Sequence, residues 1–392
     1  MPSMTAWITS AALLLGATLA VAQEAVVVGA VVSQTGAHAS PAAEYRNGLL
    51  LWQDEINAAG GLLGRKVELR LKDDGSEAAR AGPAYAELME AGAQVLIGPF
   101  GSAATLTASS EAERAQRVLL NAAGPSSQVH KRSPRFVVQT APPNIAYAEG
   151  VLELARKSGA ESLYILGRDD VTSREMAEAA LAQAARYGFR EVKLAIYPGT
   201  TNDFLPQLYE AMAVHADAWL AFGETRDGAD MVKTLKRHGY VPKLLYARSS
   251  PDPRFVKLVG QDAEHVLGSK EYDARFARAD NARFVKAYTA KWSSAPGSLA
   301  AAAYTAGTVL AAAAARAGSL EGAKLRAALG ELEVDTLLGR YRIDPASGAQ
   351  VGMRPVAVQI VAGRVQPVWP EELAAGRGVE PFVAWAERTV MQ

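Results

Sequence analysis

The sequence predicts an α/β fold made of two doubly wound, Rossmann-like lobes, and three observations support this prediction. Residues 26–32 form a continuous apolar run, which is typical of a strand buried on both faces of a parallel sheet. Strand-like and helix-like segments then alternate as far as residue 140, and this alternation indicates a mostly parallel, doubly wound sheet. The series breaks at Ala141-Pro142-Pro143 and then resumes, so we expect a second lobe built on the same plan.

The first series places its strands and helices in regular order. We expect strands at residues 26–32, 67–71, 94–97, 118–120 and 136–140. We expect three helices between these strands. The first carries Tyr45, Leu49, Leu50, Trp52 and Ile56, the second spans residues 77–90, and the third begins near Ala103.

The second series has the same alternation, and the chain changes character after it. Its strands are expected at residues 163–166, 192–196, 218–222 and 244–246, with helices near 145–157, 173–187, 203–213 and 227–238. From Tyr272 onward we expect helices at 276–292, 299–316 and 325–329, then strands at 341–344 and 356–360. The helix at 299–316 is rich in alanine, and its Tyr304, Val309 and Leu310 favour a close-packed core helix over a low-complexity segment.

Composition excludes several classes of function. The 392 residues suffice for two domains with substantial cores, and 41 basic against 41 acidic side chains indicate neither nucleic acid nor an anionic membrane as a partner. Cysteine is absent, which excludes disulfides, cysteine nucleophiles and thiolate metal sites. The five histidines do not stand at metal-ligand spacing, so we expect no metal and no cofactor.

The amino-terminal residues are typical of an export signal. Ala11 to Val21 form an apolar run that is too short to span a membrane, and Ala20-Val21-Ala22 is a small-residue cleavage pattern. No Lys or Arg precedes the run, which departs from the usual pattern. We predict a signal peptide at residues 1–22, cleaved after Ala22, in preference to a retained anchor, and hence a periplasmic protein.

The stretch from Asn57 to Asp74 is the most diagnostic in the chain. A helix is expected to stop at Gly60-Gly61, because glycine adopts positive φ without a Cβ clash, and a strand with alternating apolar residues follows. Together with the earlier segment Gly29 to Gly36, this stretch resembles the N-terminal lobe of the branched-chain amino-acid (Leu/Ile/Val) type of periplasmic binding protein. Those proteins are the extracytoplasmic receptors of ABC importers.

The resemblance implies an organisation of the whole chain. A protein of this family would cross between its lobes three times, here near residues 140–143, 270–273 and 351–355. The N-terminal lobe would then comprise residues 23–141 and 272–352, and the C-terminal lobe residues 142–271 and 353–392. The resemblance also implies a monomer that closes on a small polar ligand and delivers it to a permease and ATPase in the inner membrane.

In the first lobe, the expected ligand contacts follow the strand ends, because open α/β sheets bind ligands outside the carboxyl ends of their strands. Gly101 to Thr105 opens a helix, whose free N–H groups suit a carboxylate, helped by the Ser102 hydroxyl and with Ala103 next to it. From the residues alone, Ser102 is equally an N-cap candidate. The resemblance places Ser102 where a serine holds the ligand carboxylate, and Ala123 where a backbone carbonyl contacts the ligand. The threonine usual two residues later is replaced by Pro125, with Ser126 adjacent.

In the second lobe, the chain departs from the pattern that the resemblance implies. By the resemblance, Thr172 and Thr225 stand at about the positions where the family has aromatic ligand contacts. Pro41 stands at a further aromatic position, in the first lobe. Ser249 stands where the family has an acid that pairs with the ligand ammonium. Either Glu224, Asp170 or Asp252 takes over that pairing, or the ligand is not an α-amino acid, since a buried ammonium without a carboxylate is costly. Arg248 is a candidate second anion contact or a surface arginine. The sequence is therefore compatible with an amino acid or with a small organic acid as the ligand.

An enzyme and a ligand sensor are the two alternatives to an import receptor. The sequence has no dinucleotide-binding glycine motif after the first strand, no P-loop, no nucleophile elbow and no His-Glu-x-x-His, so we expect no enzyme. A ligand-sensing receptor or regulator subunit of the same fold, not coupled to transport, is the alternative. The predicted signal peptide favours the importer component over a cytoplasmic regulator.

Overall fold

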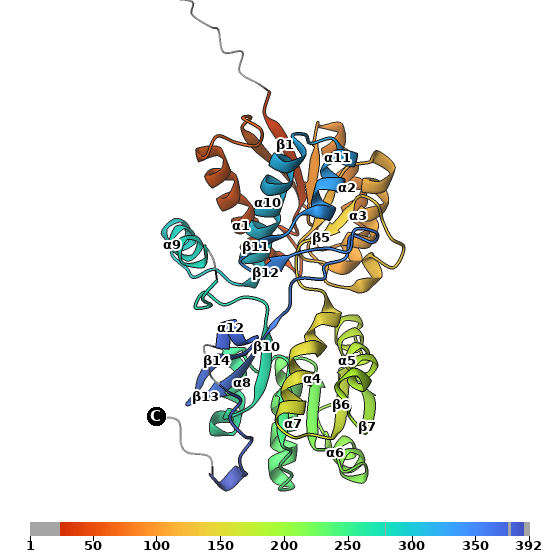
Figure 1. Cartoon of the computed structure of the whole chain (residues 1–392), viewed down its shortest axis with the longest axis vertical. Coiled ribbons are helices and arrows are strands. Elements are labelled where there is room, and N and C mark those ends of the chain that lie inside the picture. The colour runs from red at the N-terminus through yellow and green to blue at the C-terminus, as the bar shows by residue number, and fades with distance from the viewer. Residues whose placement is uncertain (1–23, 279, 375–377, 388–392) are drawn as a thin grey trace, which may run out of the picture.

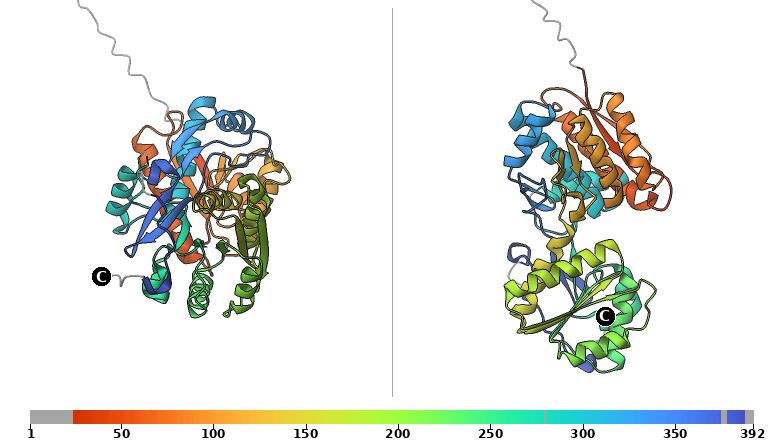
Figure 2. Two further views of the ribbon diagram at one scale, coloured as in Figure 1. Left: turned by 60° about the horizontal axis from the view of Figure 1, so that its bottom comes forward. Right: turned by 90° about the vertical axis from the view of Figure 1, so that its right-hand side faces the viewer.

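The computed structural model describes residues 24–278, 280–374 and 378–387, and in it the chain forms two lobes stacked along the long axis (Figure 1). Each lobe has its own sheet covered by helices on both faces, and connecting segments run between the lobes (Figure 2). This architecture confirms the predicted α/β fold with two doubly wound lobes. The predicted signal peptide lies outside the described residues.

The first lobe contains a five-stranded sheet in the order β2-β1-β3-β4-β5, and every neighbouring pair in it is parallel. Its strands are β1 (Val26–Val31), β2 (Val67–Lys72), β3 (Val95–Ile97), β4 (Leu119–Asn121) and β5 (Val137–Gln139). All six residues of β1 are buried, as its continuous apolar run predicts for a central parallel strand.

Helices from distant parts of the sequence cover the two faces of this sheet. One face packs against α1 (Ala39–Ala58), α10 (Ser298–Ala317) and α11 (Gly322–Glu331), and the other against α2 (Ala78–Glu90) and α3 (Ser102–Ala115). The helices α1 and α10 lie side by side (Figure 1), so closely that a Cβ on Gly48 would be 2.3 Å from the carbonyl oxygen of Ala300. By length and composition α10 could cross a membrane, but 67% of its apolar 18-residue window is buried here. It is the core helix that the sequence predicts.

The second lobe contains a seven-stranded sheet in the order β14-β13-β10-β9-β8-β6-β7. Strands β6 (Ser162–Arg168), β7 (Glu191–Tyr197), β8 (Ala218–Phe222), β9 (Leu244–Ala247) and β10 (Leu267–Lys270) are parallel, whereas β13 (Val356–Val361) runs antiparallel to both β10 and β14 (Arg364–Trp369). The helices of this lobe are α4 (Tyr147–Lys157), α5 (Val171–Ala184), α6 (Leu205–Ala213), α7 (Thr225–Arg237), α8 (Pro253–Val259) and α12 (Glu371–Ala374).

Some element predictions were wrong or incomplete. Helix α9 (Asn281–Trp292) begins five residues after the predicted start at Phe276, because Asp280 has φ of 60°, which a right-handed helix cannot contain. The strand predicted at residues 341–344 is instead β12 (Gly339–Tyr341), which pairs with β11 (Val334–Thr336) in a two-stranded ribbon. Strands β10, β11 and β14 and helices α8 and α12 were not predicted. Short 3₁₀ turns lie at Ser127–Val129, Asn144–Ala146, Ala185–Tyr187, Gly260–Ala263 and Trp385–Glu387.

The chain passes between the two sheets three times: after β5, after β10 and before β13. The first and third passages are joined, since the Gln350 backbone N–H donates to Oε1 of Gln139 and the Gln350 side-chain amide donates to the Gln139 carbonyl, both at 3.4 Å. The lobe bounds stated above stay a prediction.

Candidate functional site

The carboxyl edges of the two parallel sheets face each other. The carboxyl end of β5 leads directly into the second lobe, and the carboxyl end of β10 leads directly into the first lobe, so each of these edges lies on the side of the partner lobe. The loops that follow the strands at both edges therefore border the same space between the lobes, where the topology of α/β sheets puts ligands.

Ser102 lies at the start of α3, on the first-lobe edge. Gly101, with φ of 92°, occupies the N-cap position, so the alternative role of Ser102 as the N-cap was wrong. The Ser102 Oγ accepts a hydrogen bond from the Ser126 backbone N–H at 3.1 Å. Because this contact uses an oxygen lone pair, the hydroxyl hydrogen of Ser102 remains available to a ligand oxygen.

The structure brings the other predicted first-lobe residues close to Ser102. The carbonyl of Ala123 accepts from the Gly101 N–H at 3.0 Å, which leaves one lone pair of that carbonyl for another donor. Ser126 is 2% exposed and its Oγ accepts from the Gln128 N–H at 3.2 Å, so its side chain caps a 3₁₀ turn and its backbone orients Ser102. Ala103, the second residue of α3, is exposed. Pro41 lies in the first turn of α1, which begins earlier than predicted.

Three of the four predicted second-lobe residues gather around the loop after β8. Ser249 Oγ donates to the Gly223 carbonyl at 2.8 Å, and Nη2 of Arg248 donates to the same carbonyl at 3.3 Å. Thr225, the first residue of α7, donates to Oδ2 of Asp252 at 3.0 Å. Thr172 is half-buried near the start of α5, on a different helix from Thr225.

Of the two candidate roles of Arg248, that of an exposed surface arginine does not fit the structure. Its side chain is 20% exposed, lies 3.7 Å from the Glu224 carboxylate, and has a buried Nε without an acceptor among the described residues. A ligand anion would therefore meet a guanidinium whose position the Gly223 carbonyl already holds.

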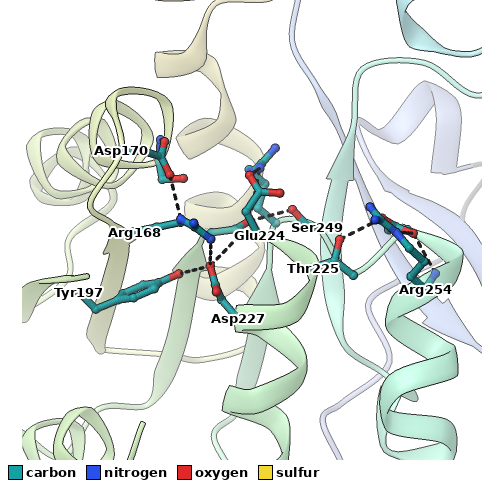
Figure 3. Close-up of polar contacts among 12 residues, drawn as sticks. Arg168, Asp170, Tyr197, Glu224, Thr225, Asp227, Ser249 and Arg254 are labelled. Carbon is teal, nitrogen blue, oxygen red and sulfur yellow. Dashed lines mark hydrogen bonds and ion pairs between the residues drawn. The ribbon is translucent and has the colours of Figure 1, made fainter. Parts of the chain in front are cut away.

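A buried aspartate that the sequence did not single out organises the same edge (Figure 3). Asp227 is 4% exposed, and its Oδ2 accepts from the Tyr197 hydroxyl at 3.0 Å, from Nη1 of Arg168 at 3.3 Å and from the Glu224 N–H at 3.0 Å. Burial and the neighbouring Asp227 charge raise the pKa of Tyr197 far above its ordinary value. With Glu224 as N-cap, Asp227 completes a capping box, and the three-residue spacing of the two acids was the sequence signal for it.

The three acids proposed from the sequence as ammonium partners are all engaged within the protein. Glu224 lies beside Arg248 at 3.7 Å. Asp170 caps α5 by accepting from the Ser173 N–H at 2.9 Å, and lies 3.6 Å from Arg168. Asp252 accepts from Thr225 and from Nε of Arg254 at 2.9 Å.

A further acid at this edge was missed. Glu271 directly follows β10, is half-buried, and accepts a hydrogen bond from the Tyr147 hydroxyl at 2.7 Å. It falls inside the predicted second passage at 270–273, but nothing in the sequence links it to Tyr147, 124 residues away. Within the described part of the chain, no group of three or more His, Cys, Asp or Glu side chains is arranged to hold a metal ion.

Residues 25–364 match the model of a family described as periplasmic binding protein. An amino acid binding protein of Pseudomonas aeruginosa is 23% identical over 249 residues, which are 59% of this chain and 65% of that protein.

Two solved structures show the same fold. A branched-chain amino acid ABC transporter protein of Rhodospirillum rubrum superimposes with a TM-score of 0.79 at 21% identity, over 88% of this chain and all of the other. A solute binding protein of an ABC transporter from Rhodopseudomonas palustris BisB5, in complex with 3,4-dihydroxybenzoic acid, has a TM-score of 0.69 at 24% identity, over 87% of this chain and 95% of the other.

The family match covers most of the chain and includes the first sheet and, in the second sheet, every strand except most of β14. It confirms the predicted resemblance, and because this is a family of binding proteins it also confirms that the chain is not an enzyme. The chain belongs to the periplasmic binding protein family.

Proposed function

We propose that this protein is the receptor of an ABC importer and binds a small carboxylate ligand, an amino acid or a small organic acid, between its lobes. The observation that carries the proposal is the Ser102 hydroxyl, which is held at the start of α3 by the Ser126 N–H, on the edge that faces the second lobe. Two similar proteins are named for ligands that carry a carboxylate: an amino acid in one case and 3,4-dihydroxybenzoic acid in the other.

The start of α3 suits that carboxylate for two physical reasons. The first N–H groups of a helix lack partners within the helix, and its dipole places partial positive charge at the same end. Ser102 adds a hydroxyl donor at this end, and Ala103 adds no side chain that would block an approaching anion. The Ala123 carbonyl and the Ser126 backbone hold the adjoining loop in place.

The opposing edge supplies the remaining contacts of the proposed site. Thr225 and Ser249 already donate their hydroxyl hydrogens to protein oxygens, so toward a ligand they act as acceptors. Arg248 is the donor for any acidic group at that end of the ligand. Thr172 would border the entrance from α5.

We further propose that the mature chain acts in the periplasm as a monomer and docks on its permease when closed. Two lobes joined by short passages open and close as hinged bodies, and the ligand stabilises the closed form by contacting both edges. A thermal-shift screen against amino acids, aromatic acids, dicarboxylates and amides tests this function. A ligand at about 100 times its Kd adds about 2.7 kcal/mol to the free energy of unfolding.

Closure predicts a change of shape that small-angle X-ray scattering measures. A ligand found in the thermal-shift screen should reduce the radius of gyration of residues 23–392, because the two edges approach each other around it. A radius of gyration that stays the same at saturating ligand would contradict the hinged closure.

Replacing Ser102 with alanine is expected to weaken a carboxylate ligand by about 1–3 kcal/mol, because the ligand oxygen loses its hydroxyl donor. Isothermal titration calorimetry measures the change. Ser109→Ala is the matched control, since Ser109 lies on the same helix and its hydroxyl donates to the Leu106 carbonyl at 2.7 Å. Equal affinity of the Ser102→Ala protein and the unaltered protein would remove Ser102 from the site.

A further inference from the structure

The carboxylate of Glu175 joins the second lobe to the first. Glu175 lies on α5, which packs through Met176 and Ala177 into the core of the second lobe. Its Oε1 accepts a hydrogen bond from the Ser127 backbone N–H at 2.7 Å, and its Oε2 accepts one from the side-chain amide of Asn144 at 2.9 Å. Ser127 belongs to the 3₁₀ turn between β4 and β5 in the first lobe, so the first of these hydrogen bonds runs from lobe to lobe.

Asn144 lies where the chain leaves the first lobe, in the first passage. It is fully buried, and its backbone N–H donates to the Pro125 carbonyl at 2.9 Å. Its Oδ1 has no hydrogen-bond partner among the described residues, so the orientation of its amide is fixed by the bond that it donates to Glu175. Glu175 therefore holds the passage between the lobes as well as the turn in the first lobe.

The loop after β4 is held at three successive residues by three different parts of the chain. Pro125 accepts from the first passage, Ser126 donates to the Ser102 hydroxyl oxygen at the start of α3, and Ser127 donates to α5. If α5 moves away from the first lobe, the last of these contacts must break or the loop that orients Ser102 must move with it.

We propose that Glu175 is a latch, formed by its hydrogen bonds from Ser127 and Asn144, that holds the two lobes at the angle seen in the structure. Its two ends are fixed in separate cores, since Val129 of the same 3₁₀ turn packs in the first lobe and α5 packs in the second. A carboxylate acceptor makes both bonds stronger than bonds between neutral groups. The inference goes beyond the proposed function, because it concerns the lobes without a ligand.

The absence of cysteine from the chain allows the lobe angle to be measured with two spin labels. Ser110→Cys on α3 and Tyr209→Cys on α6 place one nitroxide on each lobe, both at exposed positions. Pulsed electron double resonance on ligand-free residues 23–392 then gives the distribution of distances between the labels. With Glu175 intact, we expect one narrow peak.

Glu175→Ala should lower the population at this distance, relative to all other distances, by about tenfold or more, since both hydrogen bonds of the latch are lost. Ser127→Pro removes only the backbone N–H, and Ser126 before it has φ of −67° and ψ of 135°, which a following proline allows. It should broaden the distribution to a smaller extent. The double variant should match Glu175→Ala, because both changes break the same contact.

Glu178→Ala is the matched control on the same helix. Glu178 is exposed and its carboxylate lies 3.8 Å from Arg174, so its replacement should leave the latch and the distance distribution unchanged. Circular dichroism checks that each variant is folded. Glu175→Ala keeps a good helix former in α5 and carries the test if Ser127→Pro does not fold.

Three results would overturn the latch: an unchanged distribution in Glu175→Ala, equal broadening by Glu178→Ala, or a double variant broader than Glu175→Ala. Because no ligand is added, each of them leaves the carboxylate receptor and the Ser102→Ala test unaffected. Failure of every carboxylate to bind would instead overturn the proposed function and leave the latch standing.

Discussion

Replacing Asp227 with alanine is expected to lower the free energy of unfolding by about 3–5 kcal/mol, because it leaves the partners of a buried charge without an acceptor. Arg168, the Tyr197 hydroxyl and the Glu224 N–H all donate to the same carboxylate oxygen (Figure 3). The start of α7 would lose its capping box, and Arg168 would lose the closer of its two carboxylate partners, with Asp170 still 3.6 Å away.

Urea unfolding followed by circular dichroism at 222 nm measures this effect. Asp230→Ala is the control on the same helix, since Asp230 pairs with Lys233 and Arg226, two exposed cations, at 3.4 and 3.6 Å. Such surface pairs contribute about 1 kcal/mol or less. Equal losses of stability in the two variants would show that the Asp227 cluster is not a buried structural unit.

Replacing Trp52 with alanine should destabilise the first lobe by about 3–5 kcal/mol, the usual range for truncating a buried tryptophan. Trp52 is 3% exposed on α1 and fills the space above Gly307 of α10, where a Cβ would come within 2.2 Å of its ring. Removal of the ring leaves a cavity between α1 and α10, two helices that are separated in the chain by strands β2 to β10.

Hydrogen–deuterium exchange locates this loss, because the two lobes have separate cores. Amides of β1, α1 and α10 should exchange faster, and those of β6 and β8 should keep their protection. Tyr209→Ala is the control, since Tyr209 is 58% exposed on α6 and its removal leaves no cavity. Faster exchange in both lobes to the same extent would contradict separate cores.

The elements that the sequence predicted well are those whose burial is uniform. Strands β1 and β8 are buried along their whole length, so a continuous apolar run identified each of them. Strand β10 has only four residues, two of them half-buried, and β14 carries Pro367 at the edge of the sheet, so neither has the apolar pattern of a central strand. Strand β10 pairs with β9 and with β13, which comes from the far end of the chain, whereas β14 forms a hairpin with β13 through the turn at Ala362 and Gly363.

The candidate site also contains residues whose position the sequence predicted and residues whose role it did not predict. Ser102 starts the helix that follows β3, and Ala123 lies in the loop that follows β4, so strand order and the family resemblance together singled them out. The side chain of Ser126 turned out to be a cap, and Thr225 and Ser249 turned out to donate within the protein. Those roles depend on neighbours distant in sequence, which no local pattern contains.

The sequence by itself determined the two-lobed α/β fold and the family, and it predicted the edge of each sheet at which a ligand would bind. These follow from hydrophobic periodicity, glycine turns and strand order, all of which are local properties of the chain. Only the tertiary structure decided which acids at the second-lobe edge are already paired and that Glu271 meets Tyr147. The availability of a charge depends on its three-dimensional neighbours and its burial, and the linear order of residues specifies neither.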